Sequence, residues 1–172
     1  FGDAIVHIGE VSEGAVANGE TAESRVDSEF RQGSMRNHTA THLLHAALRE
    51  ILGTHVRQAG SYVGPDRLRF DYTHPEAPSR EQFSQIQRLV NDKVREDIER
   101  ETLVLPYDEA VQRGAIAFFE DKYTDQVRVV EYCEAHGHGH QHSPQCFSRE
   151  FCGGTHCDHT GQIGMFRITG ES

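Results

Sequence analysis

Two pairs of metal-binding side chains stand more than a hundred residues apart in this chain. His38 and His42 are spaced at i and i+4, so in a helix their imidazoles would lie one turn apart on one face. Cys152 and His156 enclose a Gly-Gly pair, which can bend sharply enough to turn both side chains toward a single ion. Three imidazoles and one thiol suit zinc better than calcium or magnesium, which prefer oxygen ligands. The sequence therefore predicts one Zn²⁺ site formed by both pairs.

The residues around these ligands exclude several classes of zinc protein. A zinc protease helix carries a glutamate next to its first histidine, but Thr39 occupies that position here. The sequence also lacks the Pro-Cys-x-x-Cys element of nucleobase deaminases and the closely paired cysteines of zinc fingers. Two interpretations remain on spacing alone. One is a closed structural zinc that ties the first helix to the Cys152 turn, and the other is a reactive site without an attached carboxylate base.

Uncharged polar residues near the ligands favour the reactive site. The hydroxyls of Thr39 and Thr41 and the amide of Gln58 can orient a small polar ligand beside a metal. A helical threonine can instead bond back to its own turn, which is what we expect of Thr39. His45 would lie near the metal without binding it, as a packed histidine.

Alternating helices and strands must position these side chains. A helix over about 34–52 is expected, capped by Ser34 or Asn37 and ended by Gly53. The remaining expected elements are strands at 56–63, 67–72, 102–105, 127–132 and 163–168, a long helix from a capping box at Ser79 and Gln82 to about residue 100, and a short helix from Asp108 to Gly114.

The expected fold class is α+β. Short apolar runs cut by glycines over residues 4–27 predict small strands, so residues 1–33 would form a small β-barrel-like element, the end of a barrel completed elsewhere. Residues 34–172 would form an α/β core in which an antiparallel sheet packs on helices.

Length and charge limit the class of partner. At 172 residues we expect one domain, excised from a longer protein because the chain starts at Phe1 and stops without an obvious finish. Seventeen Lys and Arg against 27 Asp and Glu give a formal charge of −10, which argues against unaided nucleic-acid binding. The negative charge is still compatible with a site that binds one end of a nucleic acid while a neighbouring domain holds the rest. No apolar run suggests a membrane span or secretion signal, so a cytoplasmic location is expected.

Cysteines and histidines crowd the last quarter of the chain. For the four cysteines (133, 146, 152 and 157), metal ligation is favoured over a disulfide framework because no secretion signal is evident. Four alternating histidines lie between Cys133 and Cys146, and they favour a weakly chelating surface loop over a second metal site. Cys157 and His159 are potential rivals of the last two zinc ligands.

Three stretches resemble the editing domain of alanyl-tRNA synthetases, and together the resemblance covers nearly the whole chain. They are Arg36 to His45, Gly64 to Asp71, and Cys152 to His156. Looser forms of the two ligand motifs occur in the threonyl-tRNA synthetase editing domain. The resemblance implies that His38, His42, Cys152 and His156 bind Zn²⁺. It also implies that Thr41 and Gln58 belong to the editing pocket, which makes these two the candidate catalytic residues. The chain departs from the family pattern at residues 133–149, which read as an insertion rich in His and Cys.

The activity implied by this resemblance is zinc-dependent hydrolysis of the ester in seryl- and glycyl-tRNA(Ala), with the tRNA(Ala) acceptor end and the remaining synthetase domains as partners. A pocket built for alanine admits glycine and serine, because one methylene or hydroxyl gives only about 1–3 kcal/mol of discrimination. The Thr41 hydroxyl could bond to the serine side chain. The alternatives are threonyl-type editing of seryl-tRNA(Thr) and a non-catalytic zinc-binding module. Arg36, Arg57, Arg67 and Arg69 are candidates for contacts with the acceptor end.

Overall fold

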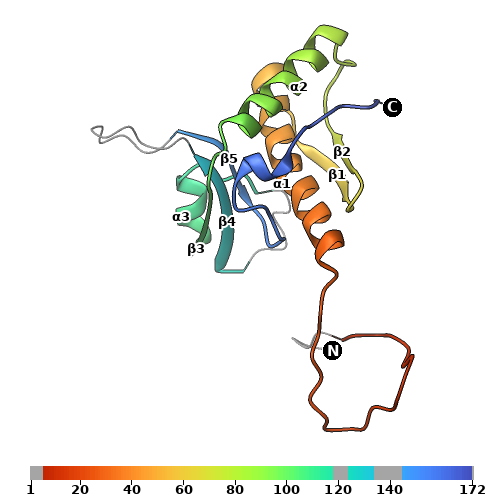
Figure 1. Ribbon diagram of the computed structural model, residues 1–172. Helices are drawn as coiled ribbons and strands as arrows, with labels where there is room; N and C mark the ends of the chain where they lie inside the picture. Colours follow the sequence, from red (N-terminus) through yellow and green to blue (C-terminus); the bar gives the residue numbers. More distant parts are fainter. Residues whose placement is uncertain (1–5, 118–123, 134–144, 172) are drawn as a thin grey trace.

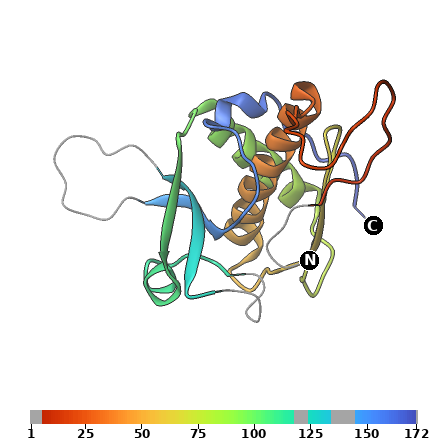
Figure 2. The ribbon, with the colours of Figure 1, turned by 90° about the horizontal axis from the view of Figure 1, so that it is seen from below.

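Two helices lie between a β-hairpin and a three-stranded sheet in the computed structural model (Figures 1 and 2), which describes residues 6–117, 124–133 and 145–171. The sheet has the antiparallel order β3-β4-β5, and the hairpin is β1-β2. In order along the chain the elements are α1 (Ser28–Leu52), β1 (Gln58–Val63), β2 (Leu68–Tyr72), α2 (Arg80–Arg95), β3 (Arg100–Pro106), α3 (Tyr107–Gln112), β4 (Gln126–Cys133), β5 (Cys146–Phe151) and the 3₁₀ helix η2 (Thr160–Ile163). This arrangement confirms mixed α and β structure with antiparallel sheets.

Helix α1 is the central element, since it contacts α2, β1, β2, β5 and η2. Its buried apolar face includes Leu43, Ala47 and Leu48. The helix begins earlier than predicted, because Asp27 accepts a hydrogen bond from the backbone N–H of Phe30 at 2.7 Å and caps it. The resulting extra turns bring α1 against the turn that joins β1 and β2.

Helix α2 confirms the predicted capping box. The Ser79 hydroxyl accepts from the Gln82 N–H at 3.2 Å, and the Gln82 side chain accepts from the Ser79 N–H at 2.8 Å. Ile86, Val90 and Val94 form its buried face. The helix ends at Arg95 and not near residue 100, as Asp97 adopts a positive φ of 51° before β3 begins.

Two predictions about strands near the C-terminus are wrong. Strand β5 was not predicted, and it pairs with β4 in the antiparallel register Val129↔Phe151. Conversely, residues 163–168 form no strand. The backbone of this segment is hydrogen-bonded by the side chain of Asn91 on α2 and not by a neighbouring strand. This side chain donates to the Phe166 carbonyl at 2.8 Å and accepts from the Phe166 N–H at 3.0 Å.

The N-terminal part also differs from expectation. Residues 6–27 contain no strand and are exposed throughout, with Ile8 97% exposed. Among the described residues there is no closed barrel, so the predicted β-barrel-like element is not observed, although residues 1–5 lie outside the described part. The expected domain division after residue 33 would fall inside α1.

The predicted cap Asp108 lies in the first turn of α3, whose N-cap is Pro106.

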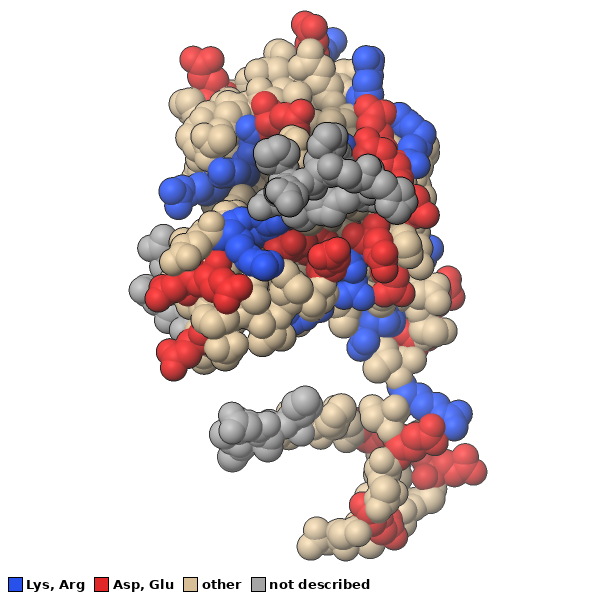
Figure 3. Space-filling view, turned by 90° about the vertical axis from the view of Figure 1, so that its left-hand side faces the viewer, with Lys and Arg blue, Asp and Glu red and all other residues tan. Residues whose placement is uncertain are grey.

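Within the described ranges, no helix combines the length and the apolarity that a bilayer crossing requires. On the side of the molecule that carries the three-stranded sheet, acidic and basic side chains are interspersed (Figure 3).

Candidate metal centre and adjoining pocket

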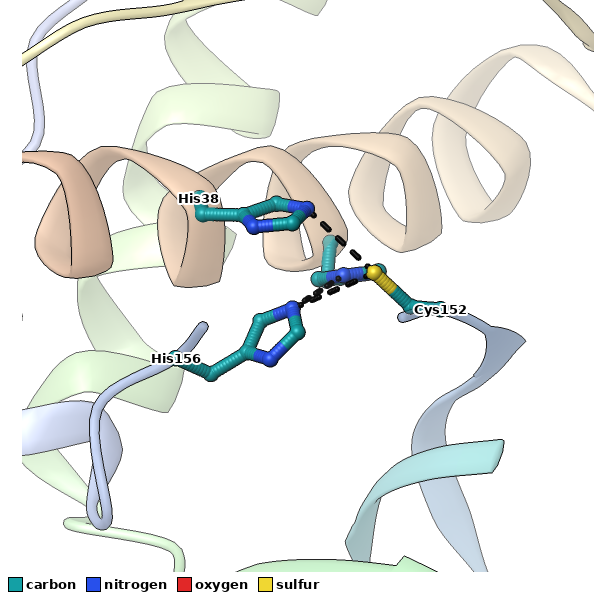
Figure 4. A group of neighbouring side chains, drawn as sticks. His38, Cys152 and His156 are labelled. Carbon is teal, nitrogen blue, oxygen red and sulfur yellow. Dashed lines mark hydrogen bonds between the residues drawn. The ribbon is translucent and has the colours of Figure 1, made fainter. Parts of the chain in front are cut away.

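The two predicted ligand pairs lie side by side in the structure, although they are more than a hundred residues apart in the sequence. His38, His42, Cys152 and His156 each offer one donor atom, and the four donors lie within 4.8 Å of one another. The Cys152 sulfur is 3.4 Å from Nε2 of His38 and 3.4 Å from Nε2 of His156. Nε2 of His42 lies 3.0 Å from Nε2 of His156. Figure 4 shows the His38 and His156 rings directed at the sulfur of Cys152.

These spacings fit a tetrahedral zinc shell. With metal–nitrogen bonds of about 2.0–2.1 Å and a metal–sulfur bond of about 2.3 Å, the edges of the tetrahedron measure roughly 3.3 to 3.6 Å. The observed separations of 3.0 to 3.4 Å are close to those edges. The chemistry of the donor set, three imidazole nitrogens and one thiolate, is also that of zinc. The cluster can therefore hold a metal ion with little movement of the side chains.

The turn after β5 approaches α1 so closely that a side chain at position 154 would displace the ring of His38. A Cβ on Gly154 would lie 2.2 Å from Cε1 of His38, whereas a Cβ on Gly153 would meet nothing within 4 Å. Arg128 on β4 holds this turn from the other side. Its guanidinium donates to the carbonyls of Cys152 at 2.6 Å and Gly154 at 2.9 Å. Arg128 is not among the residues predicted from the sequence.

Glu150 orients one of the ligands and was also missed by sequence analysis. Its carboxylate is 2% exposed and bridges two histidines, with Oε2 on Nδ1 of His42 and Oε1 on Nδ1 of His45 at 2.6 Å. Occupying Nδ1 of His42 directs its Nε2 at the other ligands. Nδ1 of His38 similarly contacts the Thr155 carbonyl at 3.2 Å. The signal available in the sequence was the position of this glutamate, two residues before the predicted ligand Cys152.

Burial and mutual contacts set the charges of the cluster. Burial alone would raise the pKa of Cys152, but hydrogen bonds with His156, His38 and His42 outweigh it and lower the pKa to about 3. Burial, opposed by Cys152, lowers the pKa of His156 to about 4. Burial would likewise lower the pKa of His42, but Glu150 and Cys152 raise it to about 10. At neutral pH the thiolate is thus ready to bind a metal, and His42 carries the proton that an ion must displace.

A cavity of about 420 Å³ adjoins the cluster and contains both candidate catalytic residues. Thr41 and Gln58 line it together with His38, His42 and Cys152. Its size falls within the range of small-molecule sites. The structure thus brings both predicted polar residues into the lining of one pocket together with three of the four donors, while His156 does not line it.

The back-bond expected of Thr39 is made by Thr41 instead. Thr41, not Thr39, bonds back to its own helix, since its hydroxyl donates to the Asn37 carbonyl at 2.8 Å. Thr39 is buried and joins α1 to the metal-binding turn. Its oxygen accepts from the Cys157 N–H at 3.0 Å and from the Tyr132 hydroxyl at 3.3 Å. The expectation for Thr39 was wrong because the surrounding fold offers it better partners than its own turn.

A β-bulge brings a further polar residue into the pocket. Gln58 pairs with Tyr72 and Gly60 with Asp71, so the residue between them on β1 has no partner on β2. This bulge places Ser61 on the same face as Gln58, although residues three apart in a regular strand face opposite sides. The Gln58 amide donates to the Ser61 hydroxyl at 3.0 Å, and both residues line the cavity.

The rival ligands lie elsewhere. Cys157 is buried and His159 is half-buried, its Nδ1 3.5 Å from the Asp97 carbonyl, and neither belongs to the group of four donors. His45 is buried near the site without joining that group, as expected. Three of the four arginines proposed to contact a nucleic acid (Arg36, Arg67 and Arg69) line a separate cavity of about 1030 Å³, and Arg57 lines neither cavity.

The preference for metal ligation over disulfides is wrong for one pair of cysteines. Cys133 and Cys146 form a disulfide at the end of β4 and β5. The two strands are antiparallel neighbours, and their pairing places the two cysteines opposite each other. The four histidines of the predicted insertion, at positions 136, 138, 140 and 142, lie outside the described residues.

Comparison with known proteins connects this site to one family. A family model described as the threonyl and alanyl tRNA synthetase second additional domain matches residues 127–172, which include Cys152 and His156. The chain is 48% identical over 168 residues to the alanine–tRNA ligase of Fervidobacterium nodosum and 47% identical over 171 residues to that of Shewanella loihica. These matches cover 98% and 99% of this chain, respectively. Over nearly its whole length the chain is therefore similar to one region of alanine–tRNA ligases.

It spans only a small part of its alanine–tRNA ligase relatives. The matched region is 18% of the Fervidobacterium nodosum protein and 20% of that of Roseiflexus castenholzii, to which the chain is 49% identical over 179 residues. His38, His42, Thr41 and Gln58 lie outside the residues of the family model but inside the region shared with these ligases.

Proposed function

We propose that this chain is the editing domain of an alanyl-tRNA synthetase, a zinc-dependent deacylase that hydrolyses the ester of seryl- and glycyl-tRNA(Ala). One observation carries the proposal: three members of the four-donor cluster and the two uncharged polar residues Thr41 and Gln58 line the same cavity. The similarity to alanine–tRNA ligases over nearly the whole chain supports it. The physical need for editing supports it too, because a pocket that binds alanine cannot strongly exclude glycine or serine.

Thr41 would recognise the serine side chain. Because its hydroxyl hydrogen is directed at the Asn37 carbonyl, the oxygen is left to accept a hydrogen bond from the pocket. The hydroxyl of a seryl ester can donate that bond, and an alanyl ester cannot. Glycine would enter as the smaller side chain. Thr41 would thus favour the mischarged seryl ester over the correct product.

Gln58 would position the attacking water. A glutamine amide is no base, but with its nitrogen donating to Ser61 its oxygen is free to accept from water or from the substrate amino group. A bound Zn²⁺ would supply positive charge at the pocket wall and, with four protein ligands, would leave no open position for activating water. We therefore assign the cluster residues to orienting the ester. The protons of the reaction would be transferred by groups outside the cluster.

The rest of the synthetase would hold the tRNA. The formal charge of −10 and the interspersed charges in Figure 3 are unsuited to binding a tRNA by phosphate neutralisation alone. Arg128 is a cation in the pocket lining, but its bonds to two backbone carbonyls already engage it. We propose that this domain receives only the acceptor end of tRNA(Ala), in the cytoplasm, from the neighbouring domains.

The test is ester release under single-turnover conditions. The chain, in excess, is incubated with seryl-tRNA(Ala), glycyl-tRNA(Ala), seryl-tRNA(Thr) and alanyl-tRNA(Ala), each with and without a metal chelator. We expect rapid release from the first two, little from alanyl-tRNA(Ala), and loss of release with chelator or in Cys152→Ser. Release that survives both treatments would refute the proposal.

The same experiment separates the two alternatives. The family description names threonyl as well as alanyl synthetases, so faster hydrolysis of seryl-tRNA(Thr) would assign the domain to threonyl-type editing. A non-catalytic zinc-binding module would retain one zinc equivalent and hydrolyse none of the four esters.

A further inference from the structure

A second group of donor atoms lies at the opposite end of β5 from Cys152. Glu131 and Cys133 on β4 and Cys146 on β5 each offer one ligand atom, and the three atoms lie within 4.8 Å of one another. Cys133 and Cys146 are joined as a disulfide in the structure. The group shares no residue with the predicted zinc centre.

A β-bulge again places these side chains on one face. Cys133 pairs with Cys146 and Tyr132 with Ser148, so Phe147 has no partner on β4. Cys146 therefore shares a face with Arg149, three residues further along, and Arg149 is the direct partner of Glu131. Four chemically active side chains thus converge at the end of a two-strand ladder.

The charges of this group are unbalanced when the sulfurs are reduced. The Glu131 carboxylate is 2% exposed, and its Oε2 lies 3.5 Å from the Cys133 sulfur and 3.9 Å from the Cys146 sulfur. Arg149 is the cation beside them, with Nε 2.7 Å from Glu131 Oε1 and Nη2 donating to the Cys146 sulfur at 2.9 Å. Among the residues that the structure describes, two thiolates and a carboxylate would carry three negative charges against the one guanidinium of Arg149. A divalent cation would bring the sum to zero, which a partly buried group favours.

We propose that the reduced form of this pair binds Zn²⁺ through Cys133, Cys146 and Glu131, with Arg149 as hydrogen-bond donor to the Cys146 thiolate. Thiolate and carboxylate ligands together suit zinc. A dithiol reductant passes two electrons and two protons to the sulfurs and becomes a disulfide itself, and the two protons leave when zinc binds. The disulfide form has no thiolate to offer, so zinc uptake depends on reduction. This site is independent of the proposed deacylase activity.

Zinc counting in two redox states tests the proposal. The metal-stripped chain is either reduced with a dithiol and freed of it without oxygen, or kept oxidised at this pair, and bound Zn²⁺ is measured after equilibrium dialysis. We expect the reduced chain to hold one more equivalent than the oxidised chain. Cobalt in place of zinc should add a thiolate-to-metal charge-transfer band with that equivalent, a readout that needs no variant.

Variants assign the extra equivalent to its ligands. Cys133→Ser combined with Cys146→Ser should remove it, whereas the control Cys157→Ser, which removes a buried thiol outside both groups, should keep it. Glu131→Gln should weaken its binding about 10-fold, as expected for a lost oxygen ligand whose bond to Arg149 survives. The proposal is overturned if reduction adds no equivalent, or if the extra equivalent persists in the double serine variant.

Discussion

Gly154 sets how closely the turn after β5 can approach α1. The ring of His38 occupies the space where a side chain at position 154 would begin. We predict that Gly154→Ala lowers zinc affinity about 10- to 100-fold, the range typical of changes that misorient a ligand. The matched control is Gly153→Ala, which adds the same methyl group to open space and should leave affinity unchanged. Competition with a chromophoric chelator measures both, and equal affinities of the two variants would contradict this geometry.

Thr41 presents an oxygen to the pocket without belonging to the donor cluster. We predict that Thr41→Val, which keeps the shape but removes the hydroxyl, lowers the ratio of seryl- to alanyl-tRNA(Ala) deacylation about 10-fold, the value of one hydrogen bond of roughly 1.4 kcal/mol. Zinc content should not change. Thr54→Val, at an exposed threonine that does not line the pocket, is the control. An unchanged ratio would remove Thr41 from serine recognition.

Helix α2 supports the site through packing alone, because its buried face contacts α1. We predict that Ser79→Ala destabilises the chain by about 1 kcal/mol through loss of the capping box. Ser84→Ala changes the same residue type at an exposed position within the helix and should have an effect below about 0.5 kcal/mol. Urea unfolding monitored by circular dichroism gives both values. A zinc stoichiometry that falls with Ser79→Ala would show that α2 affects the site directly.

Helices were easier to predict than strands, for a physical reason that particular residues illustrate. The i, i+4 spacing of His38 and His42 and the Ser79–Gln82 box are local signals, and both are confirmed. Gln58 with Ser61, and Cys146 with Arg149, share a face only because a bulge interrupts each ladder. A strand period of two assigns such pairs to opposite faces, so Ser61 and the Cys133–Cys146 pairing could not be read from spacing.

Contacts between distant segments were the least predictable part of the whole molecule. The donor set followed from residue type, but Glu150 and Arg128 became visible only when β4 and β5 were placed beside α1. The expected strands in residues 6–27 failed similarly, since short apolar runs form strands only where another strand accepts their hydrogen bonds.

Glu150 makes the stability of the metal-free fold depend on pH. Burial would raise its pKa, but His42 and His45 outweigh burial and lower it from 4.5 to about 2. A lowered carboxyl pKa stabilises the fold fully above pH 4.5, and this contribution is lost as the pH falls toward 2, in total roughly 3 kcal/mol. We predict that, in chelator, Glu150→Gln is less stable than the parent at pH 6 by about this amount and nearly equal to it near pH 2.

Unfolding in urea at several pH values checks this prediction. The control is Glu101→Gln, at an exposed glutamate on β3, whose effect should stay within about 0.5 kcal/mol. A difference between parent and Glu150→Gln that does not shrink on acidification would contradict the assigned role of the carboxylate.

The donor cluster joins His38 to Cys152, which are 114 positions apart in the chain. An ion held between them would act as a cross-link that closes most of the polypeptide into a single loop. By the chain-entropy model, closing a loop of that length restricts the unfolded ensemble by an amount worth about 4 to 5 kcal/mol. Metal supply would then govern how long the domain survives heat or proteases, quite apart from any chemistry performed in its pocket.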